Sequence, residues 1–444
     1  MVLSFKRAKA LMTQVKEHGA TDSAIESFTT RTYMIRFANN EVTVSKRFEE
    51  ESVRLYVAIG PQRAVTGTTD VTASGLKLLV NDALRLVKNT PPSDMYAPLP
   101  AGPFSYDPRL LDQRIKGVGR ERLVDMVEAA VNNALSAGAN RVAGSLVFAK
   151  THRSLLTTGG VEAESHKDTI ELSVRAFLDG ESSGQFALGS GDLNELNPEL
   201  VGWEAGEIAK TAKDPREISE GSYDTVIGPM TSANLLEEVG SMASAFYVDL
   251  GMSFLAGLLG KEVTSKALTL VDDPTVPRTF GAEAFDEEGL PTKRTVLIEG
   301  EVLKSYLHNS ATARKFNTSS TANAGIIVPH PHNLIVEGGT STVNKLLTKL
   351  DRGILITNDW YLRYQDISKG DFSTITRDGL FLIRNGTIEH AVKGLRLSDN
   401  FLRLLKNIEE VSMEKYPIRW WEVEVPVRAP YLLLRDVRFT RPTS

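Results

Sequence analysis

The chain has 444 residues, 41% of them hydrophobic and 24% charged, which predicts a globular protein of two or three domains. Its formal net charge of −5 argues against a general nucleic-acid binder, because such proteins present a basic surface to the phosphate backbone. The sequence contains no cysteine, so disulfides, thiol catalysis and thiolate–zinc sites are excluded.

The first part of the chain is predicted to form a helix, antiparallel strands and a second helix. Apolar residues at helical spacing predict the first helix over 3–18. This stretch holds no long apolar run, so we expect neither a signal peptide nor a membrane span, and a cytoplasmic protein. Alternating residues predict hairpins that turn at Asn39-Asn40 and at Gly60-Pro61, and residues 73–89 return to helical spacing.

A proline-rich segment separates this part from the next. Six of the nineteen prolines fall within residues 90–110, and proline removes a backbone donor and favours extended geometry. We therefore place a linker at 96–116, between an N-terminal α/β domain at 1–95 and a middle α/β domain at 117–220. The middle domain repeats the order of helix, strands and helix, without a sequence repeat strong enough to establish a duplication.

The last part, residues 221–444, is predicted to be rich in antiparallel strands with a few helices. A strand near 221–229 precedes a helix that contains LLEEVGSMASAF, and Asn385-Gly386 is typical of a two-residue hairpin turn. The whole chain is therefore expected to be α+β. Helices should pack on antiparallel sheets in the N-terminal half, and the β-rich C-terminal half should be barrel- or sandwich-like.

The stretch FDEEGLPTKRTVLIEGEVLKSYLHNSATARKFNTSSTANAG, residues 285–325, resembles the TldD/PmbA family, once called modulators of DNA gyrase. DGLFLIRNGTIEHAV is similar to the family's C-terminal G-x-x-I-x-N-G-x-I. Many positions matched in order are more specific than one short motif. The family pattern D-x-E-G-x-x-T, I-x-x-G-x-L and L-x-x-x-x-x-A-R falls on Asp286, Glu288, Gly289, Thr292, Ile298, Gly300, Leu303, Leu307, Ala313 and Arg314.

The resemblance implies a family with two kinds of chain. TldD-type chains bind zinc through H-E-x-x-x-H on a helix and a later cysteine, whereas TldE-type (PmbA) chains lack these residues and pair with a TldD-type chain. Here Glu237 falls on the motif's glutamate, and Leu236 and Ser241 fall where the histidines would stand. Leucine offers no ligand, serine is a poor one, and residues five apart on a regular helix diverge by roughly 140°. We expect no metal on this chain and zinc on its partner. Glu237 is compatible with a general base left over from a working site, but we favour an acid that caps, pairs or faces solvent near a helix start.

The resemblance also implies a peptide cleft. His330 and His332 would share a face on a strand, but the flanking prolines predict a loop and no nearby acid completes a metal site, so peptide contact is favoured over a metal. Asp272-Asp273 are compatible with acid/base chemistry, although a turn before proline is favoured. The remaining histidines, among them 152 and 166, are scattered and carry no motif. The candidate cleft residues are Asp286, Gly289, Thr292, Arg314, Asn323, Gly325, His330, His332 and Asn333.

Three functions remain open. The favoured one, which the resemblance implies, is a TldE-type subunit, inactive alone, of a cytosolic metallopeptidase that acts on small or unfolded peptides. It would contact neither nucleic acid nor membrane, and self-association of the isolated chain is left open. The alternatives are an autonomous hydrolase with its site at His330/His332 or Asp272/Asp273, and a regulatory binding protein that modulates gyrase or a toxin–antitoxin system.

Overall fold

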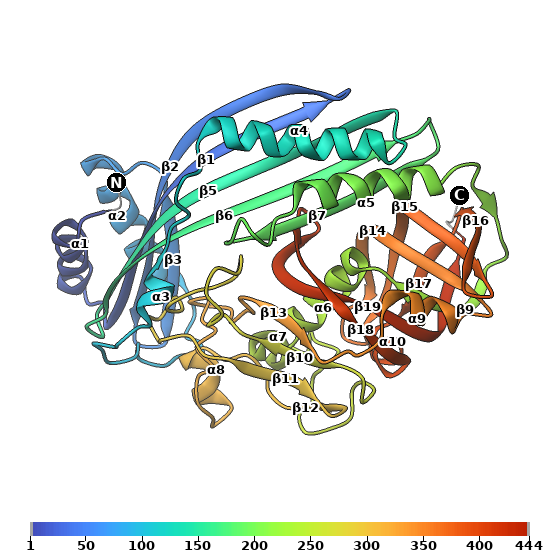
Figure 1. The fold of residues 1–444 in the computed structure, drawn as a ribbon. Coiled ribbons are helices and arrows are strands. Elements are labelled where there is room, and N and C mark those ends of the chain that lie inside the picture. Colours follow the sequence, from blue (N-terminus) through green and yellow to red (C-terminus); the bar gives the residue numbers. More distant parts are fainter. Residues whose placement is uncertain (1–2, 442–444) are drawn as a thin grey trace.

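The computed structural model describes residues 3–441 and arranges them around two sheets (Figure 1). The first is a long, curved sheet ordered β3-β2-β1-β5-β6-β4, with β7 also paired to β6. Its long strands are all antiparallel to their neighbours. The strands are β1 (Asp22–Ala38), β2 (Glu41–Ile59), β3 (Gln62–Thr68), β4 (Asp112–Gln113), β5 (Arg141–Thr157), β6 (Glu162–Phe177) and β7 (Ser183–Ser190).

Both hairpins predicted for the first part are confirmed. Asn39 and Asn40 have φ of 52° and 70°, the left-handed conformation that a two-residue turn between twisted strands requires. The second hairpin turns at Gly60-Pro61. Because β2 runs unbroken between the two turns, it serves both hairpins.

The first sheet contains two copies of one helix–strands–helix arrangement. The equivalent strands β1 and β5 pair antiparallel at the centre of this sheet. Arg31 lies opposite Lys150 near the middle of the paired region. Two equivalent antiparallel neighbours are related by a two-fold rotation, so the copies surround a local two-fold axis near these two residues. The first copy is α1 (Phe5–Glu17), β1–β3 and α2 (Ala73–Asn89), and the second is α4 (Arg120–Ser136), β5–β7 and α5 (Pro198–Thr211).

The proline-rich segment connects these two copies. The strands before residues 96–116 and the strands after them belong to the same sheet. The segment itself contains the short helix α3 (Pro108–Leu111) and the edge strand β4. Residues 96–116 therefore join two halves of one continuous sheet.

Helices cover one face of this sheet at both ends. At one end, Leu11 of α1 and the apolar side of α2 pack in a cluster with Ile25 of β1. At the other end, Leu123 of α4 and the apolar side of α5 pack in a cluster with Ile35 of the same strand. Because Ile25 and Ile35 are an even number of residues apart, both side chains lie on one face. Figure 1 shows the two helix pairs well separated along the sheet.

The C-terminal half is a twelve-stranded mixed sheet. In it β9, β14, β15, β17 and β19 pair in turn and close into a ring. The predicted α+β class with a barrel-like C-terminal half is therefore confirmed. The strands are β8 (Arg216–Glu217), β9 (Gly221–Ile227), β10 (Thr269–Asp272), β11 (Thr295–Glu299), β12 (Val302–Leu303), β13 (Leu334–Glu337), β14 (Arg352–Asp366), β15 (Asp371–Arg384), β16 (Thr387–Lys393), β17 (Arg396–Asn400), β18 (Ile408–Trp420) and β19 (Val423–Thr440).

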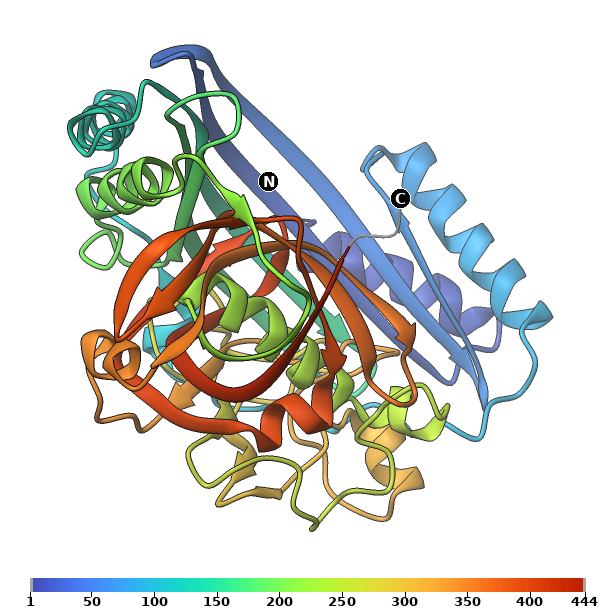
Figure 2. The same cartoon turned by 90° about the vertical axis from the view of Figure 1, so that its right-hand side faces the viewer.

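Helix α6 (Pro229–Met242) packs inside this C-terminal half. Figure 2 shows it framed by the orange and red strands of the ring, and nearly all of its side chains are buried. One continuous apolar core joins α4, the first sheet, α6 and the ring strands. The remaining helices are short: α7 (Ala245–Asp249), α8 (Ser310–Lys315), α9 (Val343–Thr348) and α10 (Phe401–Lys406).

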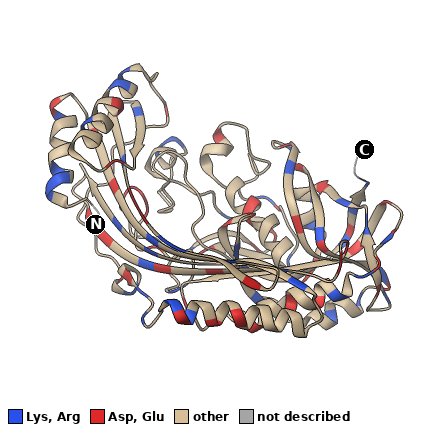
Figure 3. Ribbon diagram, turned by 90° about the horizontal axis from the view of Figure 1, so that it is seen from above, with Lys and Arg blue, Asp and Glu red and all other residues tan. Residues whose placement is uncertain are grey.

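The helices that cover the first sheet present mixed charge to solvent. Figure 3 shows acidic and basic residues interspersed along α4 and α5. Of the helices within residues 3–441, none combines the length and the apolar character needed to cross a bilayer.

Candidate functional site

Helix α6 carries the three positions, Leu236, Glu237 and Ser241, to which the family resemblance assigns the zinc motif. Proline in its first turn and a run of small and apolar residues suit a helix enclosed by strands. Leu236 is 1% exposed and packs into the main core, whereas Ser241 is half-buried near the helix end. Within residues 3–441 no three His, Asp or Glu side chains are grouped so that they could hold a metal ion. The side chains of α6 therefore do not fit a zinc ion.

Glu237 is hydrogen-bonded to a neighbouring strand. It lies in the second half of α6, so its interpretation as an acid near the helix start is wrong. Its Oε1 accepts a hydrogen bond of 2.7 Å from the backbone N–H of Val425 on β19, and burial raises its pKa to about 8. The adjacent Glu238 accepts a hydrogen bond of 2.9 Å from the Tyr364 hydroxyl, and burial raises its pKa as well. Both acids connect α6 to surrounding strands.

Asp272, at the end of β10, organises the loop that leads to the two neighbouring histidines. Its carboxylate accepts hydrogen bonds from the backbone N–H groups of His332 at 2.9 Å and Asn333 at 2.7 Å, and from the side chain of Asn323 at 2.6 Å. Burial raises the pKa of Asp272 to about 6. Asp273 instead accepts from the backbone N–H of the residue two positions on, at 3.0 Å, as a turn before proline requires. The two aspartates thus have separate structural partners.

The histidine pair lies in this tightly packed loop. The rings of His330 and His332 have centres 5.2 Å apart and planes inclined by 70°. Burial lowers the pKa of His332 to about 3, so its ring is neutral at physiological pH. A Cβ on Gly325 would lie 2.2 Å from the carbonyl oxygen of Val328, so only glycine fits there. Close packing, rather than an open metal site, describes the surroundings of both rings.

Asp286 folds a second loop next to the first. Its carboxylate accepts hydrogen bonds from the backbone N–H groups of Glu288 at 3.0 Å, Leu290 at 2.9 Å and Ala324 at 3.1 Å. Burial raises the pKa of Asp286 to about 7. Burial and the nearby Asp286 carboxylate together raise the pKa of Glu288 to about 8. The loop therefore encloses two carboxyl groups that resist ionisation.

The other predicted cleft residues differ in their surroundings. Gly289 has φ of 87° in the turn of this loop, and a Cβ there would lie within 3 Å of the Val161 side chain. The Thr292 hydroxyl donates to the carbonyl oxygen of Glu283 at 2.5 Å. Arg314 is exposed on α8. Most of the predicted residues therefore build a buried loop layer, defined here as residues 272–292 and 323–333, and their contact with a peptide stays a prediction.

Arg153 on β5 connects the loop layer to the first sheet. Its Nε donates to Glu26 at 2.7 Å, and its Nη1 donates to the carbonyl oxygen of Phe285 at 2.9 Å. The guanidinium carbon also lies 4.5 Å from the centre of the Phe285 ring. Glu26 pairs in addition with Arg54 at 2.6 Å, and Glu283 pairs with Arg153 at 3.3 Å. The charges at this junction are therefore neutralised by direct partners.

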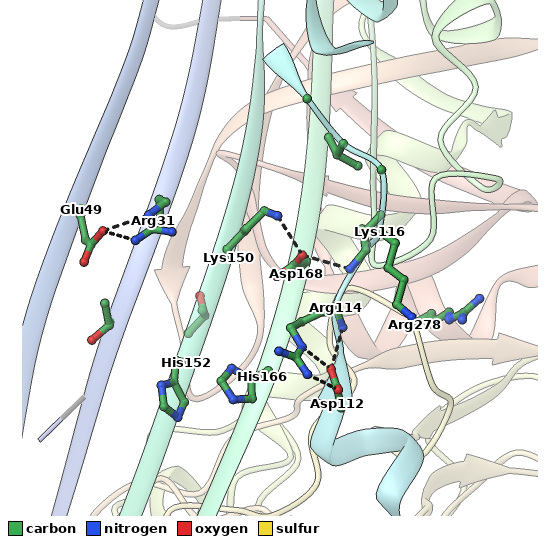
Figure 4. Close-up of a pocket in the computed structure, with 16 residues that line it drawn as sticks. Arg31, Glu49, Asp112, Arg114, Lys116, Lys150, His152, His166, Asp168 and Arg278 are labelled. Atoms are coloured by element: carbon green, nitrogen blue, oxygen red, sulfur yellow. Dashed lines mark hydrogen bonds and ion pairs between the residues drawn. The ribbon is translucent and has the colours of Figure 1, made fainter. Parts of the chain in front are cut away.

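A hollow of about 1270 Å³ opens on the opposite, helix-covered face of the first sheet (Figure 4). Its floor consists of Arg31 on β1, Lys150 and His152 on β5, and His166 and Asp168 on β6. These side chains share a face because they stand at alternate positions of paired strands. The loop before α4 forms one wall. We call this hollow the axial pocket, because it lies over the local two-fold axis.

Sequence reasoning did not find the axial pocket. His152 and His166 were expected to be scattered, but the pairing of β5 with β6 stacks their rings with centres 4.1 Å apart. The available signal was local: Thr29 and Arg31 interrupt the apolar face of β1 between Ile25 and Ile35. That signal marks an uncovered stretch of sheet, but it does not identify the partner strands.

Comparison with known proteins adds a sequence relationship to this geometry. Residues 220–441 match the model of the PmbA/TldA metallopeptidase C-terminal domain. A protein from Methanothermobacter thermautotrophicus named metalloprotease is 29% identical over 303 residues, which cover 66% of this chain and 58% of that protein. The chain thus spans little more than half of that relative. A metalloprotease PmbA homolog from Haemophilus influenzae is 23% identical over 80% of this chain and 79% of its own length.

The fold also matches a solved structure over nearly the whole chain. The crystal structure of TldE from Thermococcus kodakarensis superposes with a TM-score of 0.81 and covers 98% of this chain and 100% of that chain. The sequences of the two are 18% identical, so this likeness concerns the fold alone.

Proposed function

The chain belongs to the PmbA/TldD metallopeptidase family, and from that premise we propose that it is a PmbA/TldE-type subunit without catalytic zinc. It would act in the cytoplasm with a zinc-bearing TldD-type chain on small or unfolded peptides. The observation that supports this proposal is the composition of α6, which has Leu236 and Ser241 where the family resemblance puts the two motif histidines. A zinc site needs about four ligands, and the sequence offers no cysteine as a further one.

The surroundings of Glu237 support the same proposal. In a zinc peptidase the motif's glutamate acts as a general base on a metal-bound water. Here burial raises the pKa of Glu237 to about 8, so the side chain is mostly protonated at neutral pH. Its Oε1 is also engaged by the backbone N–H of Val425. A protonated carboxyl group with that partner does not accept a proton from water.

This chain would contribute shape and peptide presentation rather than bond cleavage. Within residues 3–441 both sheets end in edge strands, and an extended peptide could pair with such an edge through main-chain hydrogen bonds with little sequence preference. The buried loop layer and its aspartates hold the surrounding surface rigid. Cleavage would then depend on the zinc of the partner chain.

The test is reconstitution with a TldD-type chain from the same genome. We expect hydrolysis of an unstructured peptide by the mixture, stoichiometric zinc on the TldD-type chain, and neither activity nor zinc on this chain alone. Glu237→Gln in this chain should leave the activity of the mixture unchanged, whereas replacing the glutamate of the partner's H-E-x-x-x-H motif should abolish it. Hydrolysis by this chain alone that a chelator removes would contradict the proposal.

A further inference from the structure

The axial pocket occupies the uncovered middle of the helix-covered face. Ile25 lies under α1 and α2, and Ile35 lies under α4. Between them, Thr29 and Arg31 point from the same face into the pocket. Figure 1 shows the two helix pairs apart along the sheet, and the residues that line the pocket include none from α1, α2, α4 or α5.

The pocket floor carries a symmetric row of charges across four strands. Glu49 stands opposite Arg31, Arg31 opposite Lys150, and Lys150 opposite Asp168. The two cations flank the local two-fold axis and the two acids lie outside them. Figure 4 shows Arg31 bound to Glu49 and Lys150 directed at Asp168, with separations of 2.7 Å and 3.8 Å. Positive charge is therefore concentrated at the centre of the floor.

The walls of the pocket add further positive charge. Lys116 and Arg114 come from the loop before α4, and Arg278 reaches the pocket from the C-terminal half. Arg114 is paired with Asp112 at 2.5 Å and Arg278 with Asp192 at 3.8 Å, but among residues 3–441 Lys116 has no ion-pair partner. Five Lys or Arg side chains thus line the pocket against three Asp or Glu side chains, in a chain whose overall net charge is −5. The pocket is a local basic region on an acidic protein.

The stacked rings of His152 and His166 lie on the same floor. Nε2 of His152 has no hydrogen-bond partner among the described residues, and the Glu164 carboxylate lies 3.6 Å from it. The floor therefore carries two imidazole rings in addition to its charged side chains.

We propose that the axial pocket binds an acidic peptide segment. Its volume of about 1270 Å³ exceeds the roughly 300–1,000 Å³ of a small-molecule site and suits several residues of a peptide. Alternate side chains of an extended peptide are about 7 Å apart, and neighbouring strands of the floor are about 4.8 Å apart, so successive carboxylates can reach different cations. A nucleic acid fits less well, because Glu49, Asp112 and Asp168 border the pocket and would repel a backbone that is charged at every nucleotide, whereas an extended peptide turns every second side chain away from the floor. This binding belongs to the present chain alone and does not depend on the proposed peptidase partner.

The experiment measures fluorescence anisotropy of labelled peptides with the purified chain. We expect saturable binding of an oligoglutamate peptide, no binding of oligoglutamine of the same length, and weakening as salt rises from about 0.05 M to about 0.3 M. Lys116→Glu should weaken binding about tenfold. The double variant Lys116→Gln, Lys150→Gln should weaken binding by at least the same factor. Lys304→Glu, an equal change of charge at an exposed lysine outside the pocket, should leave the affinity unchanged.

Each other outcome overturns the proposal. If oligoglutamate does not bind at low salt, the proposal is wrong. If Lys116→Glu and Lys304→Glu reduce the affinity equally, the binding is non-specific electrostatic attraction and the proposal is also wrong. Equal or tighter binding of a single-stranded oligonucleotide shows that the pocket takes phosphates instead of peptide carboxylates. Circular dichroism of each variant establishes that it is folded, and Lys116 is suited to this test because its side chain is exposed. Since no TldD-type chain is present, failure here leaves the reconstitution result unaffected.

Discussion

At the scale of single residues, Glu237 has the clearest measurable consequence. Burial raises its pKa to about 8 from an ordinary value of 4.5, so the folded protein retains a proton that the unfolded chain releases. Its contribution to stability is therefore present below about pH 4.5 and is lost as pH rises through about 8. We predict that Glu237→Gln stabilises the protein by about 1 to 3 kcal/mol at pH 9 and changes stability little at pH 4.5. Urea unfolding at both pH values measures this difference.

The substitution keeps the hydrogen bond between Glu237 and β19. Glutamine retains an oxygen that accepts from the backbone N–H of Val425, so only the titrating proton is removed. Glu41→Gln, at an exposed position of β2, is the matched control and should show no such pH dependence. A loss of stability at pH 9 in Glu237→Gln would mean that the carboxylate is ionised and stabilising in the folded protein.

At the scale of elements, α6 excludes zinc by its geometry as well as by its composition. It is a regular helix from Pro229 to Met242, so positions 236 and 241 point about 140° apart, and position 236 faces the core. We predict that Leu236→His with Ser241→His does not bind zinc stoichiometrically. We also expect it to cost about 2 to 5 kcal/mol of stability, because a buried leucine is lost. Zinc analysis after dialysis, with urea unfolding of the same sample, measures both quantities.

A single-site control separates the two effects. Ser241→His alone changes a half-buried position near the helix end and should leave stability within about 1 kcal/mol of the original. Stoichiometric zinc on the double variant would show that α6 can distort enough to bring both side chains to one ion, and that composition alone separates this chain from a zinc-binding one.

The sequence predicted local elements well and long-range pairing poorly. The turns at Asn39-Asn40 and Asn385-Gly386 depend on residues that tolerate positive φ, so their own sequence determines them. The pairing of Arg31 with Lys150 depends on strands far apart in the chain, and no local pattern encodes that register. Leu236 and Ser241 stand in one contiguous stretch, so resemblance to a family motif placed both on a helix. The floor of the axial pocket combines residues from strands far apart in the chain, so only the folded structure reveals it. The burial of Asp272 and Asp286 also follows from loops that meet in space.

At the scale of the whole molecule, the two sheets are joined by apolar packing and by charge. The main core continues from α4 through the first sheet to α6 and the ring strands. The N-terminal and C-terminal halves of the chain therefore share this core. On the face of the first sheet that the helices leave uncovered, Arg153 reaches from β5 into the loop layer, and its side chain is 10% exposed. Its partners Glu26 and Glu283 are also paired with Arg54 and Lys167. The junction is thus a connected ionic network at which two halves of the chain meet.

This network predicts an unequal response to the loss of its two arginines. Arg153→Met removes a buried guanidinium from Glu26, Glu283 and the Phe285 ring, and we expect a loss of about 3 kcal/mol, since the acids remain buried with one cation each. Arg54→Met removes a cation whose side chain is 41% exposed from Glu26, which keeps Arg153, and from Glu287, and water screens these charges, so we expect a loss below about 1 kcal/mol. Urea unfolding with far-ultraviolet circular dichroism and with tryptophan fluorescence compares both variants with the original chain. If Arg153 holds the two halves together, Arg153→Met should also separate the two unfolding curves, whereas Arg54→Met should leave them coincident. Equal effects of the two substitutions would show that apolar packing alone joins the sheets.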